Sequence, residues 1–244
     1  MSGSTSVPRW SWARFRPRLT FSLRTFLALV TIFCIGLAWR LHRAKEQRGA
    51  VAGIRSAGGW VYYDYHWHDT TTDKVDAAAQ PWEPKWLLDL VGVDFFHEVT
   101  LVNLVYDDHG PKRLDNKQSP VNIAPHLAHF PQLRSLLVSG DYLDDEGMRV
   151  VGRLRLLESF YQWEGGKISD AGAEHLRGMP RLRYIHLGSS QVGDRGLAAL
   201  ATIPNLDGLS MQRNKITDAG LASLAGHAKP VSYTHLTLPT ILRV

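Results

Sequence analysis

Two aspartates and two histidines lie close together in the sequence, at Asp64, His66, His68 and Asp69. Imidazole nitrogens and carboxylates are ligands that zinc accepts. Alternate residues of a strand share one face, so an extended segment here would bring Asp64, His66 and His68 together. The spacing matches no established ligand pattern, and no general base accompanies it. We therefore interpret the segment as a solvated strand face and assign no metal site.

Other groups with chemical potential are few. The acidic triplet Asp144-Asp145-Glu146 suits either a cation or the start of a helix, and its place in a repeated pattern favours the helix start. The sequence contains no glycine loop that would cradle a phosphate and no G-x-S-x-G elbow. Its single cysteine, Cys34, lies inside an apolar run. We expect no catalytic residue and no cofactor, and a protein that is not an enzyme.

A pattern of a branched residue, Asp and Gly recurs four times in the second half of the chain. The Asp residues stand at 145, 170, 194 and 218, so the spacings are 25, 24 and 24 residues. A fixed period in the twenties is typical of a solenoid, in which each unit buries its apolar face against its neighbours. Because Asp is favoured at helix starts, we interpret the four as structural helix caps: Asp145, Asp170, Asp194 and Asp218.

Each repeat also carries an L-x-x-L-x-L skeleton before the Asp, such as Leu182, Ile185 and Leu187. Apolar residues at alternating positions predict a short strand, and the apolar pair that follows the Gly predicts a short helix. The second repeat ends its skeleton on Gln162 and has one extra residue before the next Asp, which predicts a bulge or a change of register there. A further strand is expected at residues 99–104.

These repeats resemble the leucine-rich repeat family, most fully at Leu206-x-x-Leu209-x-Met211-x-x-Asn214. The Ile-Thr-Asp-Ala-Gly-Leu phrase at 216–221 resembles the subtype found in bacterial membrane-anchored proteins. The resemblance covers residues 20–226 and implies an α/β leucine-rich repeat solenoid of short parallel strands and helices. The Asn position of the motif is Asp141, Gly165 and Ser190 in the other repeats, so the asparagine ladder is incomplete.

Residues 25–39 form an uncharged run between Arg24 and Arg40. Extended to Phe21–Leu41, it reaches the length of a transmembrane helix, with both arginines at headgroup depth. The alternatives are a buried soluble helix and a cleaved signal peptide. A small-x-small triplet at Gly36-Leu37-Ala38 would suit cleavage, but that triplet lies within the apolar run. We favour an uncleaved single-pass anchor, with the C-terminal domain outside the cytoplasm.

The net charge of +5 comes largely from basic residues around this run. Such a distribution is typical of a membrane-proximal segment rather than of a nucleic-acid interface, and we expect no nucleic-acid partner. The expected organisation is a basic stub at 1–20, a transmembrane helix at 21–41, a juxtamembrane helix at 42–58, an N-terminal cap region at 59–98, a repeat array at 99–226 and a truncated end at 227–244.

The period fails at the end of the chain, where Pro230, Tyr233 and His235 occupy expected apolar positions. Residues 231–240 instead resemble the translation of a sequencing-library adapter. We therefore interpret 231–244 as a non-native tail and expect the array to continue in the natural protein.

Residues between the strand anchors should line the concave face of the sheet, where exposed aromatics typically anchor a partner. We predict that the protein binds another protein or macromolecule there. The alternatives are that the chain is the recognition or scaffold part of a larger, truncated enzyme or signalling protein, or a structural envelope component. The predicted partner-binding residues are Arg134, Tyr161, Trp163, Arg183, Tyr184, His186, Ser210 and Gln212.

Overall fold

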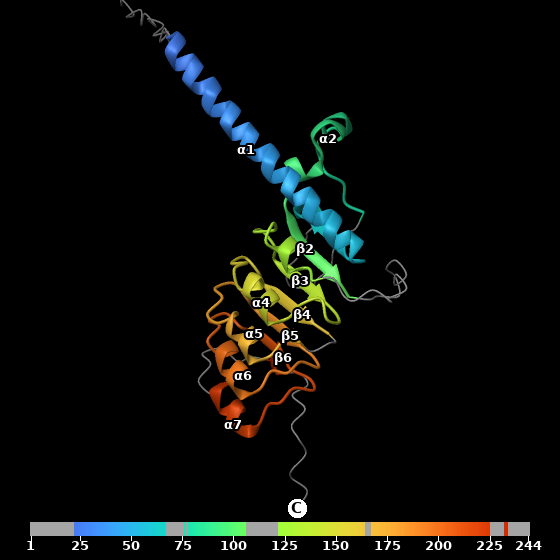
Figure 1. Ribbon diagram of the computed structural model, residues 1–244, viewed down its shortest axis with the longest axis vertical. Coiled ribbons are helices and arrows are strands. Elements are labelled where there is room, and N and C mark those ends of the chain that lie inside the picture. Colours follow the sequence, from blue (N-terminus) through green and yellow to red (C-terminus); the bar gives the residue numbers. More distant parts are fainter. Residues whose placement is uncertain are drawn as a thin grey trace, which may run out of the picture. The chain divides into compact units, whose positions relative to one another are not determined.

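The strands form where the sequence alternates apolar and polar residues, and they line up in chain order. The computed structural model describes residues 22–66, 76, 78–105, 122–163, 167–224 and 232–233. Within these, a sheet runs in the order β1 to β7. Strand β1 (Trp60–Tyr63) pairs antiparallel with β2 (Val99–Leu104), and every later neighbour pairs in parallel. Figure 1 shows β2 to β6 side by side with helices α4 to α7 stacked along them.

Each strand from β2 to β6 is followed by a short helix that leads to the next strand, as expected of an α/β leucine-rich repeat solenoid. The remaining strands are β3 (Ser135–Val138), β4 (Ser159–Gln162), β5 (Tyr184–Leu187), β6 (Gly208–Ser210) and β7 (Ser232–Tyr233). The helices between them are α3 (Ala124–Leu127), α4 (Asp145–Val151), α5 (Asp170–Glu174), α6 (Asp194–Leu200), α7 (Asp218–Leu221) and the 3-10 turn η3 (Ala222–Leu224).

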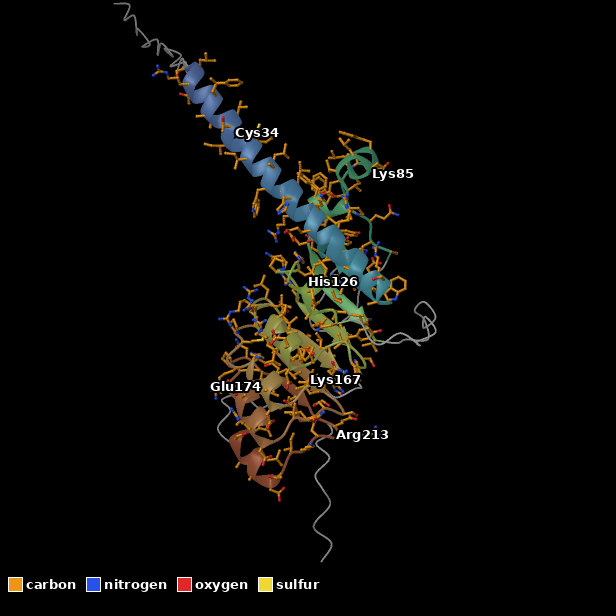
Figure 2. The ribbon with its side chains drawn as sticks, viewed as in Figure 1. Cys34, Lys85, His126, Lys167, Glu174 and Arg213 are labelled. Atoms are coloured by element: carbon orange, nitrogen blue, oxygen red, sulfur yellow. The ribbon has the colours of Figure 1, made fainter. Side chains whose placement is uncertain are left out.

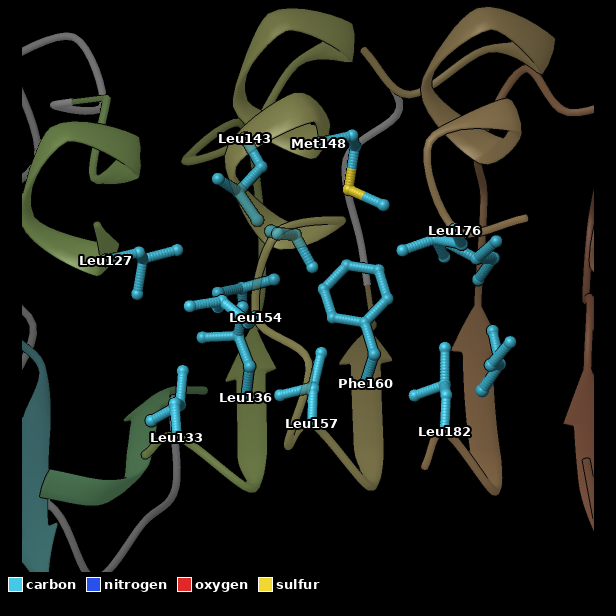
Figure 3. Packing of buried hydrophobic residues seen from close by; sticks show 14 of the residues in the cluster. Leu127, Leu133, Leu136, Leu143, Met148, Leu154, Leu157, Phe160, Leu176 and Leu182 are labelled. Atoms are coloured by element: carbon cyan, nitrogen blue, oxygen red, sulfur yellow. The ribbon is translucent and has the colours of Figure 1, made fainter. Parts of the chain in front are cut away.

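The core lies between the strands and these helices. Leu136 and Phe160 are fully buried and pair in register on β3 and β4. They belong to one cluster with Met148 and Leu176 from the helical side, and Figure 3 shows this packing. Burial of a side chain of this size stabilises the fold by about 1.5–3 kcal/mol. The apolar positions of neighbouring repeats therefore form one continuous core, as the period predicts.

The change of register expected at the second repeat is wrong for the described residues. Strand β4 pairs regularly with both neighbours, with Phe160 opposite Leu136 and Ile185. The extra residue lies after the strand, in a connection of which 164–166 are outside the described residues. A loop absorbs an inserted residue more easily than a strand hydrogen-bonded on both sides, because an insertion in such a strand shifts every following pair.

The cap region contains the 3-10 turns η1 (Asp64–His66) and η2 (Val93–Phe95) and the helix α2 (Lys85–Val91). Strand β1 covers the edge of β2, so the first parallel strand is paired on both sides. Unpaired strand edges invite aggregation, and this pairing removes one.

One helix, α1 (Leu23–Ser56), runs through the ranges expected for the transmembrane and juxtamembrane segments. It ends at Ser56, and Gly58, two residues later, has a φ of +84° that is readily adopted only by glycine. Contacts divide the chain into Met1–Trp39 and Arg40–Val244. Among the described residues, α1 is the one helix long and apolar enough to cross a membrane, by length and composition alone. The basic stub at 1–20, Phe21, and residues 225–231 and 234–244 lie outside the described residues.

The two residues of β7 fall within the predicted non-native tail. Ser232 pairs with Gly208 and Tyr233 with Leu209, one repeat length further along the chain. The backbone at this point therefore continues the parallel sheet.

Candidate partner-binding face

The parallel register brings three of the predicted partner-binding residues, Tyr161, His186 and Ser210, into one column on the sheet face opposite the helices. Tyr161 pairs with His186, and His186 with Ser210. Core residues such as Phe160 and Ile185 occupy the intervening positions, so the column points away from the core. Two residues not predicted from the sequence, Asn103 and Leu137, extend the same column across β2 and β3. Because both residues alternate with core residues along their strands, the sequence pattern could have assigned them to this face.

Trp163, just after β4, contacts two rings of this column. The rings of Tyr161 and Trp163 stack with centroids 6.1 Å apart, and those of Trp163 and His186 lie 4.4 Å apart. Trp163 is 44% exposed, whereas His186 is 8% exposed. The indole is therefore an accessible, preorganised surface, and the imidazole beneath it supports its position.

Tyr184 lies two residues before His186 on β5 and packs beside Gly208. A Cβ atom at Gly208 would lie 3.0 Å from the Tyr184 ring, so the glycine leaves space for that ring. The guanidinium of Arg183 lies 5.5 Å from the centroid of the same ring, within the range of a cation–π contact. We call Tyr161, Trp163, Tyr184 and His186 the aromatic face.

The two predicted arginines each form an ion pair with the next repeat. Arg134 Nη1 lies 3.3 Å from a carboxylate oxygen of Glu158, and Arg183 Nη2 lies 2.6 Å from one of Asp207. The hydrogen bond to Asp207 raises the pKa of Arg183 above its ordinary value. Both guanidinium groups stay partly exposed, so they border the aromatic face as fixed charges.

Ser210 and Gln212 complete the predicted set at the end of the column. Both are half-buried. The Gln212 backbone carbonyl accepts hydrogen bonds from the Ser189 amide at 2.8 Å and from the Asn214 side chain at 3.2 Å. Asn214 also donates to the Leu187 carbonyl of the preceding repeat at 2.5 Å. The last repeat is thus tied to its neighbour by the one complete Asn position of the motif.

The assignment of Asp145, Asp170, Asp194 and Asp218 as the N-caps of their own helices is wrong. All four are the first helical residue, and the N-cap is the residue before. Asp144 fills that role in α4, where its side chain accepts from the Gly147 amide at 2.8 Å. The sequence rule fails because it considers only contacts within one helix.

The carboxylates of three of these aspartates bind the next repeat instead. Asp145 accepts from the Ser169 amide at 2.7 Å and its hydroxyl at 2.6 Å. Asp194 makes the equivalent pair of bonds to Thr217, at 2.8 and 2.6 Å. We call this set of bonds, together with those of Asp170, the aspartate ladder. Its bonds satisfy backbone N–H groups at the start of the following helix, which otherwise lack a partner.

Asp170 shows why the ladder is needed. The next helix, α6, has Gly193 at its N-cap, which has no side chain to accept a hydrogen bond. Asp170 Oδ1 accepts from the amides of Gly193 and Gly196, at 2.7 and 2.9 Å. The cap of α6 is therefore supplied by the preceding repeat.

The glycine of the repeated motif makes room for this carboxylate. A Cβ atom at Gly196 would lie 2.6 Å from Asp170 Oδ1, and one at Gly172 would lie 2.4 Å from Asp145 Oδ1. Such distances are too short for a side chain. The Asp and the Gly of the motif are thus partners across the boundary between repeats.

The segment around Asp64 and His66 is not a strand face. These residues form the 3-10 turn η1, while His68 and Asp69 lie outside the described residues. His66 Nδ1 accepts from the Tyr63 amide at 3.2 Å, and burial lowers the pKa of His66, which favours the neutral ring. Among described residues, no group of three or more His, Cys, Asp or Glu is arranged to hold a metal.

Asp64 instead pairs with a histidine that the sequence did not single out. His97 Nδ1 lies 2.6 Å from Asp64 Oδ1, and its Nε2 lies 2.9 Å from Glu83 Oε2. His97 and Glu83 are buried. The imidazole therefore joins the turn after β1 to the segment before α2, and its role is to hold the cap together.

Comparison with known proteins supports a leucine-rich repeat family. Two consecutive segments, residues 179–201 and 204–225, match the family model described as Leucine Rich repeat. No curated protein matches the chain. The matched segments contain β5 to α7, with Tyr184 and His186 of the aromatic face and the Asp194–Thr217 bonds of the aspartate ladder.

Proposed function

We propose that this protein is a membrane-anchored leucine-rich repeat scaffold that binds a protein partner through the aromatic face. Leucine-rich repeat domains generally serve as scaffolds for binding proteins or other macromolecules. The single observation that carries the proposal is the stack of Tyr161, Trp163 and His186 on the open face of the sheet.

The physical argument is that such a face suits an interface better than free solvent. Rigid aromatic rings contribute much of the energy of protein interfaces, because they bury a large area while losing few rotamers. Trp163 remains accessible, and Arg134 and Arg183 supply charge at the border of the patch. Because both arginines are paired with a carboxylate, a partner with an apolar centre and polar surroundings fits this pattern.

A photocrosslinking experiment tests the site. A benzophenone amino acid replaces Trp163 in the full chain, which is expressed in the cells that encode it, and adducts are identified by mass spectrometry. The control carries the same group at Arg195, which is exposed on the helical side. We expect one partner to be captured at 163 and not at 195. Equal capture at both positions would contradict the proposal.

The membrane part of the proposal has its own support and its own test. Helix α1 contains a stretch with a mean hydropathy of 1.6, and its apolar side chains are exposed in the structure, Phe33 at 69%. Phe33→Arg places a charge in that stretch, which opposes insertion. We expect the unchanged chain to stay in membranes after alkaline extraction and the variant to be released. Loss of residues 1–38 from the mature chain would support a cleaved signal instead. Protease protection on intact cells tests the proposed position of the solenoid outside the cytoplasm.

A further inference from the structure

Helix α2 is apolar and yet buries none of its residues. Its seven residues include Trp86, Leu87, Leu88, Leu90 and Val91. Trp86 is 67% exposed, Leu90 is 73% exposed, and Trp82, just before the helix, is 84% exposed. A helix this short is not stable by itself in water, and large exposed apolar groups in series indicate a contact surface. We call Trp82, Trp86 and Leu90 the tryptophan stripe.

The two helical residues of the tryptophan stripe lie on one side of α2. Trp86 and Leu90 are four residues apart, so they lie on the same side of α2, one turn from each other. Leu87, Leu88 and Val91 are half-buried. The exposed residues of the helix also include Lys85 and Asp89, but Trp86 and Leu90 leave two large apolar side chains in solvent. A helix that only covers a protein core would bury such large apolar side chains instead of exposing them.

Side chains of α1 fix the stripe beside the residues that follow the apolar run. Arg48 Nη2 donates to the Val91 carbonyl at 2.9 Å, at the end of α2. Arg40 Nε donates to the Phe95 carbonyl at 2.9 Å. Glu83, which directly follows Trp82, is held by the buried His97. The end of α2 is thus bound to the 40–48 segment of α1, and the residue after Trp82 is bound to the cap.

The chain itself places this segment near a bilayer surface. Arg40 is the first charged residue after the uncharged run at 25–39. If α1 crosses a membrane, Arg40 lies at the depth of the headgroups. Trp side chains favour this interfacial zone, where the ring is buried and the N–H stays solvated.

We propose that the tryptophan stripe inserts into the interface of the same bilayer that α1 crosses. This inference rests on the proposed membrane anchor. Insertion gives α2 the apolar environment that the described protein does not provide, and it adds a second attachment point. A second attachment restricts rotation of the solenoid about α1, so the aromatic face keeps a set orientation relative to the membrane.

Depth-dependent quenching in vesicles tests this inference on the full chain. The single cysteine, Cys34, carries a fluorophore in the unchanged protein; its position on α1 is labelled in Figure 2. In a Cys34→Ser background, Asp89→Cys puts the label on α2 beside the stripe. Ala198→Cys, exposed on α6, is the matched control. The vesicles contain phosphatidylcholine and phosphatidylglycerol with spin labels at either headgroup or acyl-chain depth.

We expect the label at 89 to be quenched by headgroup spin labels several-fold more strongly than the label at 198. Replacing Trp82, Trp86 and Leu90 by Ser should reduce the quenching of the label at 89 to the level measured at 198. These residues are exposed, so the fold should survive, which circular dichroism checks.

The outcomes separate this inference from the anchor. If Cys34 is quenched by acyl-chain labels but 89 behaves as 198 does, the stripe does not insert and the anchor stands. If Cys34 is not quenched, the anchor fails and the inference falls with it. Shielding of 89 from aqueous iodide without lipid quenching would mean that a protein, such as a second copy, covers the stripe, and would overturn the inference.

Discussion

Asp170 Oδ1 lies 2.9 Å from the backbone nitrogen of Gly196, one repeat further along the chain, and accepts its N–H. The same close approach of an aspartate carboxylate to a glycine of the next repeat recurs between Asp145 and Gly172 and between Asp194 and Gly220. In both cases a Cβ atom on the glycine would overlap the carboxylate oxygen. The Asp and Gly of the motif therefore allow neighbouring repeats to stack, and they do not form a binding site.

Gly196→Ala should destabilise the solenoid by about 1–3 kcal/mol, because the new methyl group overlaps the Asp170 carboxylate in a packed boundary. In a free helix the same change stabilises by about 1 kcal/mol. Gly49→Ala is the control, since a Cβ there meets nothing within 4 Å. Urea unfolding of the full chain in detergent micelles measures both.

A double variant that combines Gly196→Ala with Asp170→Ala measures the interaction between these two residues. Asp170→Ala alone should cost about 1–3 kcal/mol, because two backbone N–H groups lose their acceptor. With the carboxylate absent, Gly196→Ala should cost much less than it does in the unchanged chain. Additive effects of the two changes would mean that they do not interact.

The ladder also predicts a pH dependence at Asp194. Hydrogen bonds from the Thr217 hydroxyl and amide lower the pKa of Asp194 below its ordinary value of 3.8. A lowered pKa means that the stabilising contribution is complete above that value and is lost as the pH falls below it. Thr217→Val should move the pKa of Asp194 back towards 3.8, as followed by carbon NMR of the carboxyl group. Ser223→Ala, whose hydroxyl contacts a backbone carbonyl, should leave it unchanged.

Tyr63→Phe should weaken the N-terminal cap. The Tyr63 hydroxyl donates to Asp94 Oδ1 at 3.0 Å, and both side chains are buried. Hydrogen bonds to charged groups contribute about 1.5–3 kcal/mol, so a loss of that size is expected. Tyr62→Phe, at the neighbouring and less buried position of β1, is the control. Hydrogen exchange of the β1 and β2 amides measures the effect, and equal protection in both variants would argue against it.

The repeated fold was predictable because its information is local. The spacing of the Asp-x-Gly motif and the alternation in segments such as 184–187 depend on the period of the chain and on strand geometry. Helix α2 forms at Lys85–Val91, directly after Pro84, in a short apolar run that is visible in the sequence. Such features need no knowledge of distant contacts.

The errors concern contacts between distant residues. The capping rule gave Asp170 to its own helix, whereas its partners lie 23 and 26 residues further along. His97 was missed because Asp64 and Glu83 are 33 and 14 residues away. Gln162 interrupts a column of apolar residues, and the sequence suggested a shifted strand. In the structure the register is unchanged, and the Gln162 side-chain amide donates a hydrogen bond of 2.7 Å to the Gly140 carbonyl.

The aromatic face was predictable in membership but not in geometry. Alternation alone assigned Tyr161, Trp163 and His186 to one side of the sheet. The stack depends on the parallel register, which pairs Tyr161 with His186, and on the position of Trp163 just beyond the end of β4. Whether a side chain is an accessible anchor or a support, as with Trp163 and His186, follows only from packing.

The most direct test of the central claim is the affinity of the captured partner for single variants of the full chain in lipid nanodiscs. Trp163→Ala removes the exposed ring of the aromatic face and should weaken binding by more than tenfold, as expected when a central aromatic anchor costs about 2 kcal/mol or more. Arg195→Ala, on the helical side, should leave the affinity unchanged. Equal affinity of the Trp163→Ala variant and the unchanged chain would contradict binding through the aromatic face.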